Sequence, residues 1–252
     1  MEILALERNE LQFFSLWSKQ KITKRLTLLY NPNLFDDFLF NHARPTDPEE
    51  TLGYRDLKYV KKFYSRLKIK PTLIFKAELD SNQKRLLSEE GFKATDLLIT
   101  MTARTRPSSA SRPYLTILAC SEDDVAEWVK VFVEAYSTPS WLRELSNIVA
   151  KMVRHPRCTL YLARYKGVSV GVAARYSAEG VSGLYCLGTT PKVRNRGVGG
   201  ALVAHVIGEA YRSGDEIICL QTLASEHLTR FYARLGFRRL YSKTIYSSEV
   251  PI

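Results

Sequence analysis

The residues of this chain with the clearest chemical potential lie between Arg194 and Gly200, in the run Arg-Asn-Arg-Gly-Val-Gly-Gly. Glycine adopts backbone conformations that other residues avoid, and it lets the main chain approach a ligand closely. A helix-forming segment follows, and the first N–H groups of a helix, together with the positive end of its dipole, attract anions. The run therefore predicts a diphosphate site, although a tight turn into a helix would use the same residues.

The elements around this run must position it, and the chain after residue 113 alternates between strand and helix patterns. Short apolar and β-branched runs predict strands, and apolar residues at helical spacing predict helices. We expect strands at 114–119, 158–164, 169–176, 184–189, 216–222 and 239–247, and helices at 121–133, from about 140 to 152, at 199–213 and at 226–235. The fold class is then α/β, with a mixed sheet and helices on both sides.

Two segments together resemble the signatures of a known family. The first is the P-x-x-R-x-x-G-x-G loop at residues 191–199, placed between a strand and an apolar helix. The second, about thirty residues further on, is a strand and a helix that ends in Y-x-x-x-G-F at residues 232–237. In this order and spacing, residues 113–252 resemble the GNAT (Gcn5-related) N-acetyltransferase family. The resemblance implies the GNAT acyl-CoA N-acyltransferase fold and acetyl transfer to an amine by direct attack.

The resemblance also implies that acetyl-CoA is the co-substrate and that backbone amides of the glycine-rich loop hold its pyrophosphate. The strand before the loop would part from its neighbour and pair with the pantetheine arm. Ser225 lies where many members of the family carry an Asn that contacts this arm. The expected co-substrate residues are Leu187, Gly188, Thr189, Arg194, Asn195, Arg196, Gly197, Val198, Gly199, Gly200, Ala201 and Ser225.

One catalytic residue follows from the resemblance, because Tyr232 lies where the family has a tyrosine near the CoA sulfur. A thiolate leaving group needs a proton or a hydrogen bond, and a phenol can donate either. The alternative is an aromatic side chain that only packs in its helix. No general base is evident, since the place where a related branch carries a carboxylate is Gly183; Glu179, Tyr185 and a relayed water stay open.

The N-terminal part of the chain resembles a degraded copy of the same half-fold. A shift of 145 residues places 70–75 on the fifth strand, 81–92 on the last helix with its Gly-Phe ending, and 96–101 on the last strand. We therefore expect a truncated, inactive GNAT-like domain at 1–102, a Ser-, Pro- and Arg-rich linker at 103–112, and the GNAT domain at 113–252. An unrelated α/β segment is the alternative for residues 1–102.

The same shift shows what the copy lacks. Residues 49–54, Glu-Glu-Thr-Leu-Gly-Tyr, correspond to the phosphate loop. Their two carboxylates would lie where the loop is expected to bind an anion. Leu87 corresponds to Tyr232. Only about forty residues precede this region, which are too few for all the early strands and helices.

Composition limits the other functions. The net charge of +11 is spread almost evenly over the chain, and it favours polyanions such as CoA; without a nucleic-acid-reading motif, nucleic acid is an unlikely partner. Four distant cysteines without a C-x-x-C pair predict thiols and no metal site. No basic and apolar leader pattern is visible, so a cytoplasmic location without membrane contact is expected.

The acceptor cannot be read from the sequence. We expect an amine-bearing small molecule, a protein N-terminus or a lysine, selected by the loop near residues 136–143, where no known motif occurs. A non-catalytic CoA-binding or regulatory module is the alternative function, and an oligomer is possible.

Overall fold

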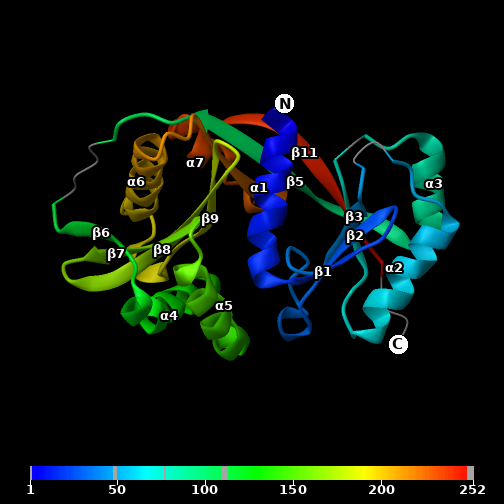
Figure 1. Ribbon diagram of the computed structural model, residues 1–252, viewed down its shortest axis with the longest axis horizontal. Helices are drawn as coiled ribbons and strands as arrows, with labels where there is room; N and C mark the ends of the chain where they lie inside the picture. The colour runs from blue at the N-terminus through cyan, green and yellow to red at the C-terminus, as the bar shows by residue number, and fades with distance from the viewer. Residues whose placement is uncertain (1, 48–49, 77, 109–112, 249–252) are drawn as a thin grey trace. The chain divides into compact units, whose positions relative to one another are not determined.

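The computed structural model describes residues 2–47, 50–76, 78–108 and 113–248 (Figure 1). Within these residues, eleven strands hydrogen-bond in the order β1-β2-β3-β4-β11-β5-β10-β9-β8-β7-β6. The sheet is mixed, because β9 pairs parallel with β10 and antiparallel with β8. The expected α/β fold with a mixed sheet is confirmed.

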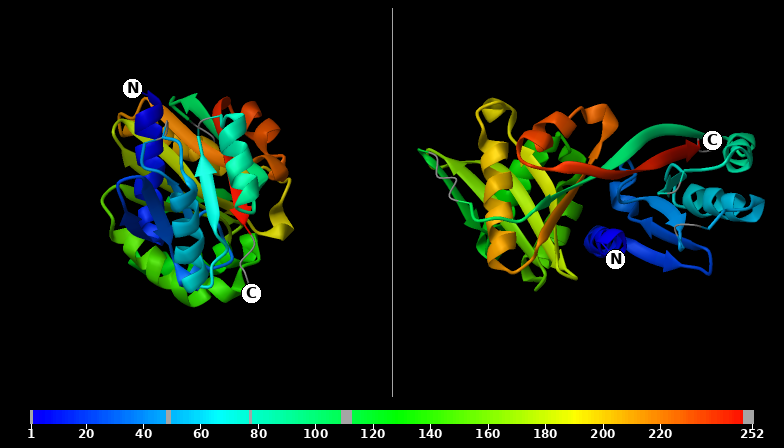
Figure 2. Two further views of the ribbon diagram at one scale, coloured as in Figure 1. Left: turned by 90° about the vertical axis from the view of Figure 1, so that its right-hand side faces the viewer. Right: turned by 90° about the horizontal axis from the view of Figure 1, so that it is seen from above.

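The chain divides into two compact units, each assembled from separate segments. Unit 1 contains residues 1–13, 101–220 and 230–238, and unit 2 contains residues 14–100, 221–229 and 239–252. The sequence had suggested consecutive parts instead, divided at residues 103–112. The long strands β5 (Phe92–Arg104) and β11 (Arg238–Ser248), which run side by side in Figure 2, each contribute residues to both units.

The start of the expected linker is part of the sheet. Ala103 and Arg104 end β5, and the Thr105 N–H donates to the Glu216 carbonyl at 3.0 Å. Sequence reasoning missed this because Ser, Pro and Arg dominate the segment, whereas backbone pairing decides whether residues extend a strand. Residues 109–112 lie outside the described residues.

Unit 1 is built on an antiparallel meander that the sequence predicted to within a few residues. Its strands are β6 (Leu115–Ala119), β7 (Cys158–Tyr165), β8 (Val168–Ala178) and β9 (Val181–Thr189), followed across the sheet by β10 (Ile217–Leu223). The β7–β8 hairpin turns at Lys166 and Gly167, both of which have positive φ (+51° and +80°).

Helices cover both faces of this meander. One face carries α4 (Val125–Tyr136) and α5 (Leu142–Arg154), and the other carries α6 (Val198–Arg212) (Figures 1 and 2). A side chain added at Gly171 would meet α6, whereas Gly188, which pairs with the next residue along β8, lies against α4. Consecutive strand residues point to opposite faces, so the two observations agree.

Most residues of the apolar helix faces are buried, although Val125 and Val133 of α4, expected on the same face, are only partly buried. The buried residues comprise Trp128, Val129 and Phe132 of α4, Leu145, Ile148, Val149 and Met152 of α5, and Leu202, Val203, Val206 and Ile207 of α6. Among the described helices, none combines the length and apolar character that a membrane crossing needs.

The last helix is shorter than predicted. A 3₁₀ turn at Ala224–Glu226 ends at His227 in the left-handed conformation (φ +56°), so α7 covers only Thr229–Arg234. A left-handed residue interrupts the helical hydrogen-bond pattern, which explains why 226–235 is not one helix.

Unit 2 contains the elements that the repeat predicted, together with others. The predicted strand at 70–75, helix at 81–90 and strand at 96–101 correspond to β4 (Thr72–Phe75), α3 (Ser81–Glu89) and the middle of β5. The elements of unit 2 not foreseen are β1 (Lys19–Ile22), β2 (Leu26–Tyr30) and β3 (His42–Pro45), while α2 (Tyr54–Arg66) follows the degraded loop. The helix α1 (Glu2–Trp17) was not foreseen either, and most of it belongs to unit 1. The short strands pack on a core that includes Leu28, Leu57, Tyr64, Leu73 and Phe92.

Unit 2 also holds a carboxyl group in an unfavourable place. Burial raises the pKa of Asp37 to about 6, and the neighbouring charges of Asp36 and Glu226 add to this rise, although the Leu39 N–H donates to the carboxylate at 2.7 Å. The folded state therefore binds this proton more tightly than the unfolded chain does. Ionised Asp37 destabilises the fold, and this effect grows as the pH rises from about 4 to about 6.

We predict that Asp37→Asn raises the free energy of unfolding by about 1–3 kcal/mol at about pH 7.5 and changes it little at about pH 4. Asparagine keeps an acceptor for the Leu39 N–H and removes the charge. Urea denaturation at the two pH values measures the difference. Asp123→Asn, at an exposed position, controls for the loss of one charge. Equal effects of Asp37→Asn at both pH values would contradict this account.

Candidate functional site

The predicted phosphate loop connects β9 to α6 in unit 1. After Thr189, a 3₁₀ turn at Pro191–Val193 leads to Asn195 (φ +61°) and to Gly197 (φ +79°), which precedes α6. Two left-handed residues so close together turn the chain sharply, and Gly197 adopts this conformation without a steric penalty. The helix therefore begins with its free N–H groups facing the loop.

The first turn of α6 leaves room for a ligand. A Cβ added at Gly199 would lie 3.7 Å from the Phe231 ring and 3.9 Å from Thr189, and one added at Gly200 would lie 3.8 Å from Leu235. Packing within the protein thus does not demand glycine at either position. The turn also contains no acidic residue. Space and charge here suit a diphosphate, whose oxygens need close access to backbone N–H groups.

The two loop arginines differ in their surroundings. Arg194 donates through Nη2 to the Ala135 carbonyl at 2.8 Å, so its side chain fastens the loop to the end of α4. Arg196 is exposed, and among the described residues no ion-pair partner for it is found. Arg196 is therefore the better placed of the two for a phosphate group.

β9 parts from β10 before it reaches the loop. The parallel pairing runs from the Val181–Ile217 pair to the Gly183–Cys219 pair, while β9 continues to Thr189 beside β8. Cys186 lies in the left-handed region (φ +53°), where the β8–β9 register also shifts. The last part of β9, which contains Leu187, Gly188 and Thr189, thus has a side that β10 does not pair.

Tyr136, at the end of α4, covers part of this segment. Its hydroxyl donates to the Leu187 carbonyl at 2.8 Å, and its ring would lie 2.8 Å from a Cβ added at Gly188. Gly188 is therefore needed for close packing, which the sequence did not reveal. Tyr136 begins the loop that was expected to select the acceptor.

Tyr232 lies in α7 and is 7% exposed. Its ring centroid is 5.0 Å from that of Phe231 and 6.1 Å from that of Phe237, both in edge contacts. Phe231 in turn lies nearest to Gly199, so α7 packs beside the start of α6. Tyr232 is thus both part of an aromatic cluster and a neighbour of the phosphate loop.

The place expected for a carboxylate base at Gly183 is filled by other groups. A Cβ added there would overlap the Tyr185 ring and lie 2.5 Å from Asn9 Oδ1. The Tyr185 hydroxyl donates to Asn9 Oδ1 at 2.9 Å, and Asn9 Nδ2 donates to the carbonyls of Val181 and Tyr176 at 2.9 and 3.1 Å. A phenol that already donates to an amide oxygen is not available as a base in this arrangement.

Sequence reasoning missed the contribution of α1 to this unit. Asn9 is fully buried, and Phe13 stacks on Tyr185 with centroids 3.8 Å apart and planes at 5°. The signal was present but weak: Leu6, Asn9 and Phe13 share one helix face, and a polar residue in an apolar stripe marks a buried hydrogen bond.

Glu179 and the four histidines are other side chains that could accept a proton. Glu179 forms an exposed ion pair with Arg8 at 3.3 Å in the β8–β9 turn, at the other end of β9 from the loop. His42 is buried, and desolvation lowers its pKa to about 3. His155 follows α5, His205 lies beside Glu209 in α6, and His227 ends a 3₁₀ turn. Within the described residues, no group of three His, Cys, Asp or Glu is arranged to hold a metal.

Ser225, expected near the pantetheine arm, belongs to unit 2. Its hydroxyl donates to Asp96 Oδ2, and its N–H donates to Asp96 Oδ1 at 3.3 Å. Both donors are therefore engaged with a carboxylate of β5. A contact with a ligand would have to compete with these hydrogen bonds.

A parallel strand pair that separates before a glycine-rich turn into a helix, inside a mixed sheet, defines a GNAT-type fold. Residues 156–239 match the family model described as "Acetyltransferase (GNAT) domain", and this range contains the loop and Tyr232. A comparison with curated proteins gave no match.

Several solved structures resemble this chain over nearly its whole length, including the part before residue 156 that the family model does not match. A GCN5-related N-acetyltransferase from Kribbella flavida has a TM-score of 0.71 at 18% identity, covering 96% of this chain and 94% of that chain. A GCN5-related N-acetyltransferase from Sphaerobacter thermophilus has a TM-score of 0.69 at 15% sequence identity, and the match covers 98% of this chain and 90% of that chain. A tandem GNAT protein from the clavulanic acid biosynthesis pathway has a TM-score of 0.60 at 10% sequence identity, and the match covers 84% of this chain and 76% of that chain. These likenesses establish the GNAT fold.

We predict that Asn9→Ala lowers the free energy of unfolding by about 2–4 kcal/mol, because it removes three buried hydrogen bonds, to the carbonyls of Tyr176 and Val181 and from the Tyr185 hydroxyl. Chemical denaturation measures the change. Arg8→Ala, on the same helix, removes only an exposed ion pair and should cost less than about 1 kcal/mol. Similar losses in the two variants would show that Asn9 does not hold α1 to β9.

Proposed function

We propose that this protein is an N-acetyltransferase that moves the acetyl group of acetyl-CoA to an amine. The observation that carries the proposal is the first turn of α6, which combines free N–H groups, the left-handed Gly197 and open space at Gly199. A turn that only joined a strand to a helix would not need such space. The family likeness of residues 156–239 supports the same activity.

The residues that would hold acetyl-CoA lie on three segments. The amides from Arg194 to Ala201 would bind the pyrophosphate, and the exposed Arg196 would add charge. Leu187, Gly188 and Thr189 offer the unpaired side of β9 to the pantetheine amides. Ser225 is the weakest member of the predicted set, because Asp96 occupies its donors.

Acetyl-CoA supplies an acetyl thioester, and the reaction forms a C–N bond to the amine while the C–S bond breaks. Tyr232 would donate its phenolic proton to the departing sulfur, and the amine would lose a proton to solvent. A neutral amine attacks without a strong base, so the Asn9–Tyr185 pair at the expected base position is compatible with catalysis.

Unit 2 would not bind a second acetyl-CoA. Gly53, which precedes α2, has φ −97°, and its N–H donates to Asp56 Oδ2 at 2.9 Å. A carboxylate from the chain itself therefore occupies the N-terminus of α2, and Glu50 lies close by in an ion pair with Arg25. Glu49 lies outside the described residues. This supports an inactive N-terminal copy.

The acceptor would enter beside the end of α4. Ser137 there is left-handed (φ +56°), and the 3₁₀ turn Pro139–Trp141 follows. A turnover screen with polyamines, amino acids, aminoglycosides and peptide N-termini would identify the class of amine.

We predict that calorimetry finds one acetyl-CoA site per chain and that Gly199→Glu abolishes it. The added carboxylate repels the pyrophosphate, while the open surroundings of Gly199 let the mutant fold. Gly53→Glu, at the start of α2, is the matched control and should leave affinity unchanged. Two sites of equal affinity, or unaltered binding by folded Gly199→Glu, would refute the assignment.

We predict that Tyr232→Phe lowers kcat by about ten- to a thousandfold with little change in acetyl-CoA affinity. The ring and its contacts with Phe231 and Phe237 remain, and only the hydroxyl is lost. The loss should shrink for an acyl donor whose thiol leaves more easily.

The measurement needs an identified acceptor, saturating acetyl-CoA and conditions in which chemistry limits the rate. Equal rates for the mutant and the parent would assign Tyr232 to packing alone.

A further inference from the structure

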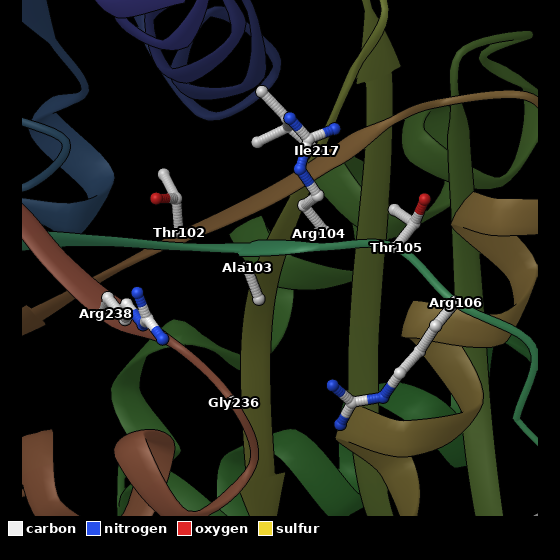
Figure 3. A pocket seen from close by; sticks show the side chains of 8 residues that line it. All are labelled: Thr102, Ala103, Arg104, Thr105, Arg106, Ile217, Gly236 and Arg238. Carbon is white, nitrogen blue, oxygen red and sulfur yellow. The ribbon is translucent and has the colours of Figure 1, made fainter.

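A pocket lies in unit 1 at the end of β5, and no residue of the first turn of α6 is among those that line it. It has a volume of about 490 Å³ and is lined by the end of β5, by Ile217 at the start of β10, and by Gly236 and Arg238 after α7 (Figure 3). Pockets of this size hold small organic ligands.

Two arginines converge on this pocket. The guanidinium groups of Arg106 and Arg238 point toward one another on the side of β5 that carries the Ala103 methyl group, whereas Arg104 points to the other side (Figure 3). The lining contains no Asp or Glu. Arg104 has Glu216 as a distant partner at 3.8 Å, but the described residues provide no ion-pair partner for Arg106 or Arg238.

Arg106 is held in place by the chain that ends α7. Its Nη2 donates to the Leu235 carbonyl at 3.0 Å. A Cβ added at Gly236, whose φ is +100°, would lie 2.9 Å from Arg106 Nη1, so glycine lets the guanidinium lie close to the backbone. A guanidinium has five N–H donors, and the remaining ones are available to a ligand.

We propose that Arg106 and Arg238 form a binding site for a phosphate monoester. Two guanidinium groups, each with paired N–H donors, match the two negative charges and several oxygens of a phosphate monoester. A single carboxylate carries one negative charge and would neutralise only one of the two arginines. The pocket is larger than a phosphate, and the Ala103 methyl group, on the same side of β5 as the two arginines, offers an apolar contact for an organic part (Figure 3). The phosphate belongs either to a separate metabolite or to the 3′-phosphate of CoA.

Titration with phenyl phosphate, followed by phosphorus NMR at low ionic strength, tests the site without reliance on acyl transfer. The Gly199→Glu background removes the phosphate loop as a competing site. In this background, Arg238→Gln should weaken phenyl phosphate binding about tenfold. Arg239→Gln, which removes the same charge from the adjacent residue, should change it less than about twofold.

A second arm identifies the source of the phosphate. In the protein with Gly199 intact, Arg238→Gln is compared for binding of CoA and of 3′-dephospho-CoA. A loss confined to CoA would assign the site to its 3′-phosphate, whereas phenyl phosphate binding without such a loss would assign it to a separate ligand. Equal effects of Arg238→Gln and Arg239→Gln on phenyl phosphate, or no effect of Arg238→Gln on any of the ligands, would overturn the proposal.

Discussion

The separation of β9 from β10 is the constraint on which the candidate site depends. Backbone N–H and C=O groups need partners, and a strand in the middle of a sheet normally finds them on both sides. Beyond Gly183, β9 pairs with β8 but not with β10, and one of its carbonyls, that of Leu187, accepts instead from Tyr136. A segment whose β10 side has no strand partner would be suited to an amide-bearing ligand such as the pantetheine arm of the proposed co-substrate.

The N-termini of α6 and α2 differ in charge, and this difference decides which of them suits an anion. α6 begins with a left-handed glycine and an open first turn without acidic residues. α2 begins with Gly53 in an extended conformation, and Asp56 accepts the N–H that a phosphate would need. The two ends share a strand-to-helix context, yet the first turn of α6 has no acidic residue, whereas a carboxylate of the chain itself lies at the start of α2.

The N-terminal residues are integral to unit 1. Asn9 joins three partners at the start of β9 and the end of β8, and Phe13 covers Tyr185. Together they fill the space above Gly183, which explains why that residue has no side chain. The region that a related branch uses for a base is here a packed hydrogen-bonded pair, so under the proposed function the acceptor would lose its proton by other means.

Local periodicity and glycine placement in the sequence were enough to predict the strands and helices between residues 114 and 223, the turn before α6, and the three elements β4, α3 and β5 of the repeat. The sequence did not determine that residues 1–13 join unit 1, that 103–104 extend a strand, or that 221–229 and 239–252 belong to unit 2. Such assignments depend on backbone pairing between segments distant in sequence, which local patterns do not encode. The partners of Arg194 and Ser225, and the convergence of Arg106 with Arg238, were decided by the tertiary structure for the same reason: side chains meet across the fold, whereas a motif gives only their order.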